Sequence, residues 1–187
     1  MDNVLHYAKK LAADVLPADG IAIDATTGNG HDTVFLARLA SNGKVYSFDI
    51  QKQALDSCRE KLAQEQLQAE LIHDGHEHAE KYVEEEGVHV VMFNLGYLPG
   101  GPKDVTTHAD STIGALTFFL EKLLPGGRII LVVYHGHEEG KAEKEELLPF
   151  LQSLPQHAYQ VLQYGFINQK NDPPFICAIE KRRRWKG

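Results

Sequence analysis

A glycine-rich turn directly after a short apolar run is the feature that most restricts the fold of this chain. The run, residues 21–25, is bounded by turn-forming residues, which is typical of a buried strand. Gly28 and Gly30 in the turn allow the backbone to bend tightly and to approach a ligand closely. Residues 32–40 then have helical character, and residues 45–49 form a second strand. A strand, turn, helix and strand in this order predict a parallel sheet.

The alternation continues along the rest of the chain. Further strands are expected at 70–73, 88–93, 128–134, 159–167 and 175–180. Helices are expected at 4–16, 54–62, 76–86, 110–123 and 138–154. A turn at 125–127 leads into the fifth strand, and a turn at 171–174 makes the last two strands an antiparallel hairpin. We therefore predict a single α/β domain, residues 1–187, with a mostly parallel seven-stranded sheet covered by helices on both faces.

Charge and composition narrow the class of protein. The net charge of -7 argues against a protein that coats nucleic acid indiscriminately. The basic run at 181–186 is either a solvated tail or a phosphate contact. No apolar run approaches the ~20 residues that span a bilayer, and no signal peptide is expected. Cys58 and Cys177 cannot form a disulfide framework, so a cytoplasmic protein without membrane contact is expected.

An acidic residue follows the second strand at the position where nucleoside-binding folds recognise ribose. Asp49 stands 21 residues after Gly28 and can accept hydrogen bonds from both ribose hydroxyls of an adenosine. The turn departs from the dinucleotide pattern G-x-G-x-x-G, because Thr33 replaces the third glycine. Asp24 suits a cationic amino group, held through the turn or a water. These features favour S-adenosylmethionine, which has no phosphate, over a nucleotide or a purely structural turn.

The end of the third strand is expected to border the adenine of such a cofactor. Asp74 can accept from the adenine amino group, and His76 can lie near the ring. His73, His76 and His78 lie close together in the sequence, which also suggests a metal site. A matching third set of ligands is missing, so no metal is predicted.

The end of the fourth strand carries the residues expected to hold a methyl acceptor. The amide oxygen of Asn94 and a neighbouring carbonyl can accept from an amine N–H, which aims the nitrogen lone pair at the methyl carbon. Gly96 permits close approach, and Tyr97 offers a stacking face. His135, after the fifth strand, is a candidate proton acceptor. The alternatives are a loop with a buried tyrosine and a histidine that caps a helix.

Four segments of the chain resemble those of one small protein family found in Gram-positive bacteria. They are Asp-Ala-Thr-Thr-Gly-Asn-Gly-His-Asp at 24–32, Phe-Asp-Ile-Gln at 48–51, His-Asp-Gly-His at 73–76 and Phe-Asn-Leu-Gly-Tyr-Leu-Pro-Gly-Gly at 93–101. The family was long labelled as rRNA methylases and is associated with tRNA wobble-uridine modification. The resemblance implies a Rossmann-like class I methyltransferase that methylates the 5-aminomethyl group of 2-thiouridine in the tRNA anticodon region. It also implies that S-adenosylmethionine contacts Thr27, Asn29, Asp32, Asp49, Gln51 and His76.

The segment from Asn94 to Tyr97 is similar to the N-P-P-Y motif of amino-group methyltransferases. Here Leu95 and Gly96 replace the two prolines, which fits an aliphatic amine better than a planar base amine. Three alternatives remain at this point: an rRNA amino-group methyltransferase, a small-molecule methyltransferase and a catalytically silent nucleotide-binding module. Whether the chain forms a homodimer is also left open.

Overall fold

The computed structural model describes residues 1–96 and 107–183. The helices are α1 (Val4–Ala13), α2 (His31–Leu39), α3 (Lys52–Gln64), the 3₁₀ helix η1 (His76–Lys81), α4 (Ala109–Lys122) and α5 (Glu138–Ser153). The strands are β1 (Ile21–Asp24), β2 (Lys44–Phe48), β3 (Glu70–Ile72), β4 (Val88–Leu95), β5 (Leu123–Val133), β6 (Tyr159–Tyr164) and β7 (Phe175–Lys181).

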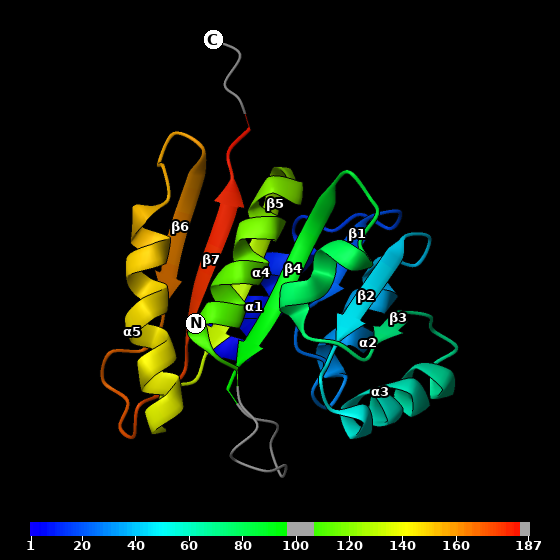
Figure 1. Ribbon diagram of the computed structural model, residues 1–187, viewed down its shortest axis with the longest axis horizontal. Coiled ribbons are helices and arrows are strands. Elements are labelled where there is room, and N and C mark those ends of the chain that lie inside the picture. Colours follow the sequence, from blue (N-terminus) through cyan, green and yellow to red (C-terminus); the bar gives the residue numbers. More distant parts are fainter. Residues whose placement is uncertain (97–106, 184–187) are drawn as a thin grey trace.

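The seven strands form one sheet in the order β3-β2-β1-β4-β5-β7-β6 (Figure 1). The first five in this order are parallel, whereas β7 is antiparallel to both β5 and β6. The predicted mostly parallel sheet and its C-terminal hairpin are therefore confirmed. The order reverses between β1 and β4, and ligands of such sheets bind beside that switch point, at the carboxyl ends of the strands.

Side chains alternate along each strand between two cores. Ala22 and Met92 pack with α1, α2 and α3, whereas Ile23 and Phe93 pack on the opposite face with η1, α4 and α5. Figure 1 shows α4 and α5 on the near side of the sheet and α1 and α2 behind it. Because both faces are covered, the central strands are mostly apolar, as is typical of parallel sheets.

Three local predictions were wrong in detail. Residues 76–86 form only a short 3₁₀ helix that ends at Lys81, and the sixth strand ends at Tyr164. The turn at 125–127 lies inside β5, because Val88 pairs with Leu123 while Val90 pairs with Arg128. The residues between these pairs bulge out of the ladder, and a positive φ of 86° at Gly126 accommodates the bend.

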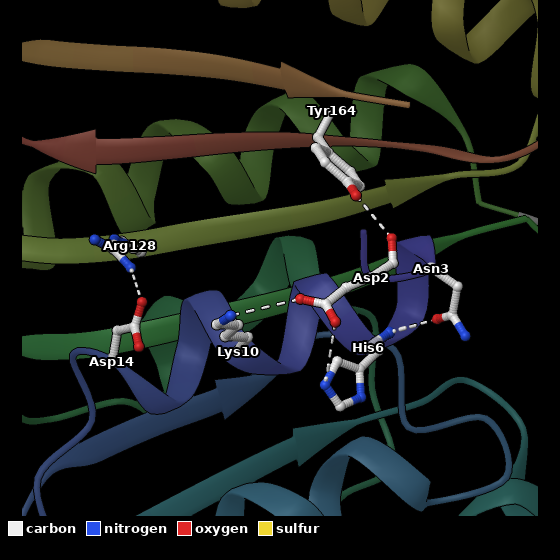
Figure 2. Close-up of polar contacts among 7 residues, drawn as sticks. All are labelled: Asp2, Asn3, His6, Lys10, Asp14, Arg128 and Tyr164. Atoms are coloured by element: carbon white, nitrogen blue, oxygen red, sulfur yellow. Dashed lines mark hydrogen bonds and ion pairs between the residues drawn. The ribbon is translucent and has the colours of Figure 1, made fainter. Parts of the chain in front are cut away.

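Helix α1 is tied to the sheet at both of its ends (Figure 2). At the start, Asn3 caps the helix by accepting from the backbone N–H of His6, and the Tyr164 hydroxyl donates to the Asp2 carbonyl over 2.7 Å. At the other end, the Arg128 guanidinium donates to the Leu11 carbonyl over 3.0 Å. These ties hold the first turns of α1 beside the carboxyl edge of the sheet. No helix in the described parts of the chain is long and apolar enough to cross a membrane.

Candidate functional site

Two cavities lie at the carboxyl edge of the sheet, beside the switch point. The first has a volume of about 440 Å³, and its lining includes Asp49, Gln51, Asp74, His76 and Thr107. The second has a volume of about 870 Å³, and its lining includes Leu5, Lys9, Thr27, Asn29, Asp32, Tyr134, His135 and Asp172. Asn94 and Gly96 line both cavities. The end of β4 is therefore the place where the two cavities meet.

The glycine-rich turn is fastened to the end of β2. Gly28 has φ 50° and donates its N–H to Asp49 over 2.9 Å. Gly30 has φ 77° at the start of α2, and a Cβ there would lie 2.8 Å from the Cβ of Cys58. Both glycines are thus required by backbone conformation, and Gly30 also by close packing. Neither glycine lines a cavity, so they shape the turn around the site.

Asp24 lies beneath the turn and has no exposed surface. Its carboxylate accepts from the Thr33 hydroxyl over 2.6 Å and from the Thr26 N–H over 3.1 Å. Burial, followed by the nearby negative charge of Asp32, raises the pKa of Asp24 to about 7. The side chain lines neither cavity, so Asp24 cannot contact a ligand there directly. The predicted influence of Asp24 on a cationic group could act only through the turn.

Thr27 turns its hydroxyl inward rather than towards a ligand. The hydroxyl donates to the Phe48 carbonyl over 3.0 Å and lies 2.6 Å from the Ser47 hydroxyl. Ser47 in turn lies 2.7 Å from the Thr33 hydroxyl, so a buried chain of hydroxyls joins β2 to α2. Thr27 also lines the second cavity, so a cofactor contact by this residue would not use the hydroxyl hydrogen, which is already donated.

Asp49 stands in the first cavity with both carboxylate oxygens on backbone donors. One oxygen accepts from Gly28 and the other from the Gln51 N–H, each over 2.9 Å. Each carboxylate oxygen can accept a second hydrogen bond, so the predicted ribose contact remains available. Gln51 precedes α3 and also lines this cavity.

His76 lines the first cavity, and one of its ring nitrogens has no partner among the described residues. Its Nδ1 lies 2.8 Å from the Ala25 carbonyl, which can only accept, so this nitrogen carries the proton. Burial lowers the pKa of the 7% exposed His76, and the neutral ring leaves Nε2 as an acceptor. That nitrogen is buried and has no hydrogen-bond partner within residues 1–96 and 107–183. Because this nitrogen has almost no accessible surface, a ligand could reach it only after the surrounding side chains move.

Asp74 lines the same cavity but has partners of its own. Its oxygens accept from the Tyr82 hydroxyl over 2.8 Å and from the Gly75 N–H over 2.8 Å, and one lies 2.7 Å from His78 Nδ1. The hydrogen bond with His78 is the main reason that the pKa of Asp74 falls to about 2. The carboxylate is therefore ionised, and the predicted adenine contact would have to use its remaining lone pairs.

Asn94 is fixed at the junction of the cavities by two hydrogen bonds. Its backbone N–H donates to the Thr26 hydroxyl over 2.7 Å, and its side-chain nitrogen donates to Asp32 over 2.5 Å. No donor from the described residues reaches the side-chain oxygen. The amide therefore gives its nitrogen to the protein and keeps its oxygen as an acceptor for a ligand.

Comparisons with known proteins identify the family of the chain. Residues 45–180 match the protein family described as "Putative rRNA methylase". The chain belongs to this family. It is similar to a protein of Arabidopsis thaliana named tRNA (mnm(5)s(2)U34)-methyltransferase, chloroplastic, with 36% identity over 179 residues, or 89% of this chain. The chain spans 65% of that relative's length.

Two solved structures are similar over nearly the whole chain. A "putative rRNA-methylase" from Clostridium thermocellum is 41% identical, with a TM-score of 0.94 and coverage of 97% of this chain and 98% of that one. A "putative methyltransferase" from Streptococcus mutans, solved in complex with SAH, is 43% identical, with a TM-score of 0.90 and coverage of 97% and 99%. The fold of this chain is thus the Rossmann-like fold of S-adenosylmethionine-dependent methyltransferases.

His135 and Tyr97 were also predicted to lie in the site, and only His135 is among the described residues. His135 lines the second cavity, and its Nε2 lies 3.0 Å from the Pro173 carbonyl, so this nitrogen carries a proton. Only Nδ1 is then left to take a proton from a substrate. Tyr97 lies outside the described residues. Tyr134 is an aromatic side chain in the second cavity, and burial, followed by the charge of Asp32, raises the pKa of its hydroxyl.

The three histidines that suggested a metal site each contact a different residue. His73 Nε2 lies 3.0 Å from the Ile50 carbonyl, whereas His76 faces Ala25 and His78 faces Asp74. In the part of the chain that the structure describes, no group of three or more His, Cys, Asp or Glu side chains is arranged to hold a metal ion.

Several residues at the site were missed by the sequence analysis. Thr26 contacts Asn94, and Lys9 contacts Asp32. Thr107 contacts Gly96 at the end of β4, and Glu143 contacts Thr107. Thr26 stands in the recognised turn, so its position was a usable signal. Lys9 and Glu143 lie on helices far away in sequence, and nothing in their local pattern distinguishes them from solvated charges.

Proposed function

We propose that this methylase transfers a methyl group from S-adenosylmethionine to the 5-aminomethyl group of 2-thiouridine at the tRNA wobble position. The observation that carries the proposal is the placement of Asn94. It lies where the two cavities meet, and its amide oxygen is left to accept from an amine. The product would be 5-methylaminomethyl-2-thiouridine.

The first cavity fits the adenosine part of the cofactor. Asp49 offers acceptors for ribose hydroxyls, and His76 lines the same cavity, where the adenine would lie. S-adenosylmethionine, when bound, supplies an electrophilic methyl carbon on a positively charged sulfur, which leaves with the electron pair of the broken bond. Asn29 and Asp32 line the second cavity and would face the amino-acid end. The protein's contribution is orientation and electrostatics.

The second cavity fits the acceptor. An aliphatic amine is mostly protonated at neutral pH and must lose a proton before it attacks. Asp32 is the carboxylate bonded to Asn94, and Lys9 Nζ lies 3.8 Å from it. The positive charge of Lys9 offsets the negative charge of Asp32, so the pair does not hold the amine in its ammonium form. His135 Nδ1 can take the released proton. Tyr134 offers an aromatic surface on which the uracil ring can stack.

The names of the relatives support an RNA substrate. The Arabidopsis relative is named for the modified uridine at position 34 of tRNA, and an anticodon base is presented unpaired, so little energy is needed to bring it into a pocket. Two similar solved structures are of bacterial proteins, and bacterial tRNA is in the cytoplasm, so we place the proposed reaction there. The family description favours rRNA as the second candidate, with the same residues acting on a different amine.

Nucleoside mass spectrometry of RNA from a strain that lacks the gene tests the proposal. We expect tRNA to accumulate 5-aminomethyl-2-thiouridine and to lose the methylated nucleoside, and we expect a plasmid copy of the gene to reverse both changes. A loss confined to methylated nucleosides of rRNA would replace the proposal with the second candidate. Unchanged tRNA and rRNA would instead indicate a small-molecule acceptor.

A further inference from the structure

A carboxylate without a role in the proposed chemistry is buried behind the end of β4. Glu143, on α5, is 3% exposed. One of its oxygens accepts from the Thr107 hydroxyl and the other from the Thr112 hydroxyl, each over 2.7 Å. No ion pair from the described residues reaches it. Burial of a carboxylate is unfavourable unless hydrogen bonds compensate, so the two threonines account for its presence in the core.

Thr107 connects this carboxylate to Gly96, which directly follows β4. Its hydroxyl donates to Glu143 and accepts from the Gly96 N–H over 2.9 Å. Its own N–H donates to the Gly96 carbonyl over 3.1 Å. Gly96 and Thr107 are thus joined by two hydrogen bonds, although they are eleven positions apart.

The direction of these hydrogen bonds depends on the carboxylate. A threonine hydroxyl has one hydrogen and rotates freely until something binds it. Because Glu143 accepts that hydrogen, a lone pair of the Thr107 oxygen is turned towards the Gly96 N–H. Gly96 follows Asn94 by two residues, has φ 146° and lines both cavities. The backbone that carries Asn94 is therefore held from α5.

We infer that Glu143 and Thr107 are positioning residues that fix Gly96, and through it Asn94, for attack on the methyl group. The inference rests on the proposed role of Asn94 in methyl transfer. An apolar residue could fill the space of Glu143, but it could not orient the Thr107 hydroxyl. The carboxylate thus sets geometry rather than stability.

Thr107→Val and Thr112→Val form a matched pair that tests the inference. Each removes one hydroxyl that donates to Glu143 and keeps the side-chain size, but only the change at 107 removes the acceptor of the Gly96 N–H. Three readouts are compared with wild type: exchange of the Gly96 amide hydrogen by NMR, SAH affinity by calorimetry, and single-turnover transfer of labelled methyl groups. Bulk RNA from a strain that lacks the gene serves as acceptor, so no particular nucleoside is presupposed.

We expect Thr107→Val to slow methyl transfer roughly 10- to 100-fold, in line with a small misplacement of a reacting group. SAH affinity should change less than about threefold, since the loss falls on the chemical step rather than on binding. Gly96 exchange should become faster. Thr112→Val should leave the transfer rate and Gly96 exchange close to wild type, and Thr107→Ser should restore both.

Equal losses of rate in the two valine variants would overturn the inference and make Glu143 an ordinary buried polar group. A wild-type rate in Thr107→Val would also overturn it. If Thr107→Val does not fold, Glu143→Leu replaces it, because leucine fills much of the space but offers no acceptor to the Thr107 hydroxyl, and slower transfer is again expected. If wild-type protein methylates no RNA, the proposed function fails, whereas Gly96 exchange still decides whether Glu143 and Thr107 hold this residue.

Discussion

The side-chain amide of Asn94 donates to the carboxylate of Asp32 over 2.5 Å, which joins the end of β4 to the first turn of α2. The hydrogen bond fixes which end of the amide faces a substrate. A carboxylate in place of the amide would meet Asp32 at the same distance, with repulsion instead of attraction.

We expect Asn94→Ala to lower methyl transfer on the order of a hundredfold, because it removes the group that positions the acceptor. Asn94→Asp should lose a similar amount, since it sets two carboxylates against each other. Cofactor affinity should change much less than turnover. The measurement is single-turnover methylation of tRNA that carries 5-aminomethyl-2-thiouridine, with tRNA that lacks the aminomethyl group as control. Equal methylation of both tRNAs by wild type would show that the amine is not the acceptor.

Asp49→Ala should weaken binding of S-adenosylmethionine, measured by calorimetric titration. Hydrogen bonds to a charged group contribute about 1.5–3 kcal/mol each, and two are assigned to ribose. The variant also leaves the N–H groups of Gly28 and Gln51 without their acceptor, so some loss of stability is expected. Asp49→Asn, which keeps the shape and one acceptor, is the control. Wild-type affinity in the alanine variant would remove Asp49 from the site.

The pKa of Asp24, raised from 3.8 to about 7, makes stability depend on pH. The folded state holds this proton more tightly than the unfolded state, so the free energy of unfolding should fall as pH rises from about 4 to about 7. Above that window the penalty is complete. Asp24→Asn cannot ionise, so its stability relative to wild type should improve across the same window. Urea unfolding at a series of pH values tests this, and parallel curves would contradict it.

Gly30→Ala should destabilise the fold by roughly 2–4 kcal/mol, because φ is 77° and the new methyl would press on Cys58. Gly114→Ala is the matched control. Gly114 lies inside α4, and a methyl group added there would have nothing within 4 Å, so alanine should stabilise the fold by about 0.5–1 kcal/mol. Urea denaturation measures both. A loss at 114 equal to that at 30 would mean that the close packing of Gly30 is not the cause.

The basic C-terminal residues remain a predicted site of phosphate binding. Arg184 lies outside the described residues, whereas Arg182 and Arg183 follow the end of β7 beside the start of β6, at the edge of the sheet opposite the cavities. Neutralising all three should weaken RNA binding and lower its salt dependence by about one unit of slope for each phosphate that the protein no longer neutralises. SAH affinity should not change, because the cavities are remote. An unaltered salt slope would support a solvated tail.

Local pattern predicted most of the scaffold. The alternation of apolar runs with helical periodicity is a short-range property, and it was enough for the sheet, the hairpin and the turn at Gly28 and Gly30. The spacing from Gly28 to Asp49 was also readable, because a strand, turn, helix and strand of ordinary length bring these residues together. The strand ends could be named for the same reason, since the carboxyl ends of parallel strands share one edge.

Sequence pattern alone therefore specifies the order and type of the elements and the edge where the site lies. Packing in three dimensions sets which atoms meet there. The inward turn of the Thr27 hydroxyl, the amide orientation of Asn94 and the bulge at 125–127 each depend on a partner from another element. Asp32 and Asn94 are 62 positions apart, and Thr107 and Glu143 are 36 apart. Such contacts leave no periodic trace in the chain, because hydrogen-bond direction depends on packed neighbours rather than on sequence spacing.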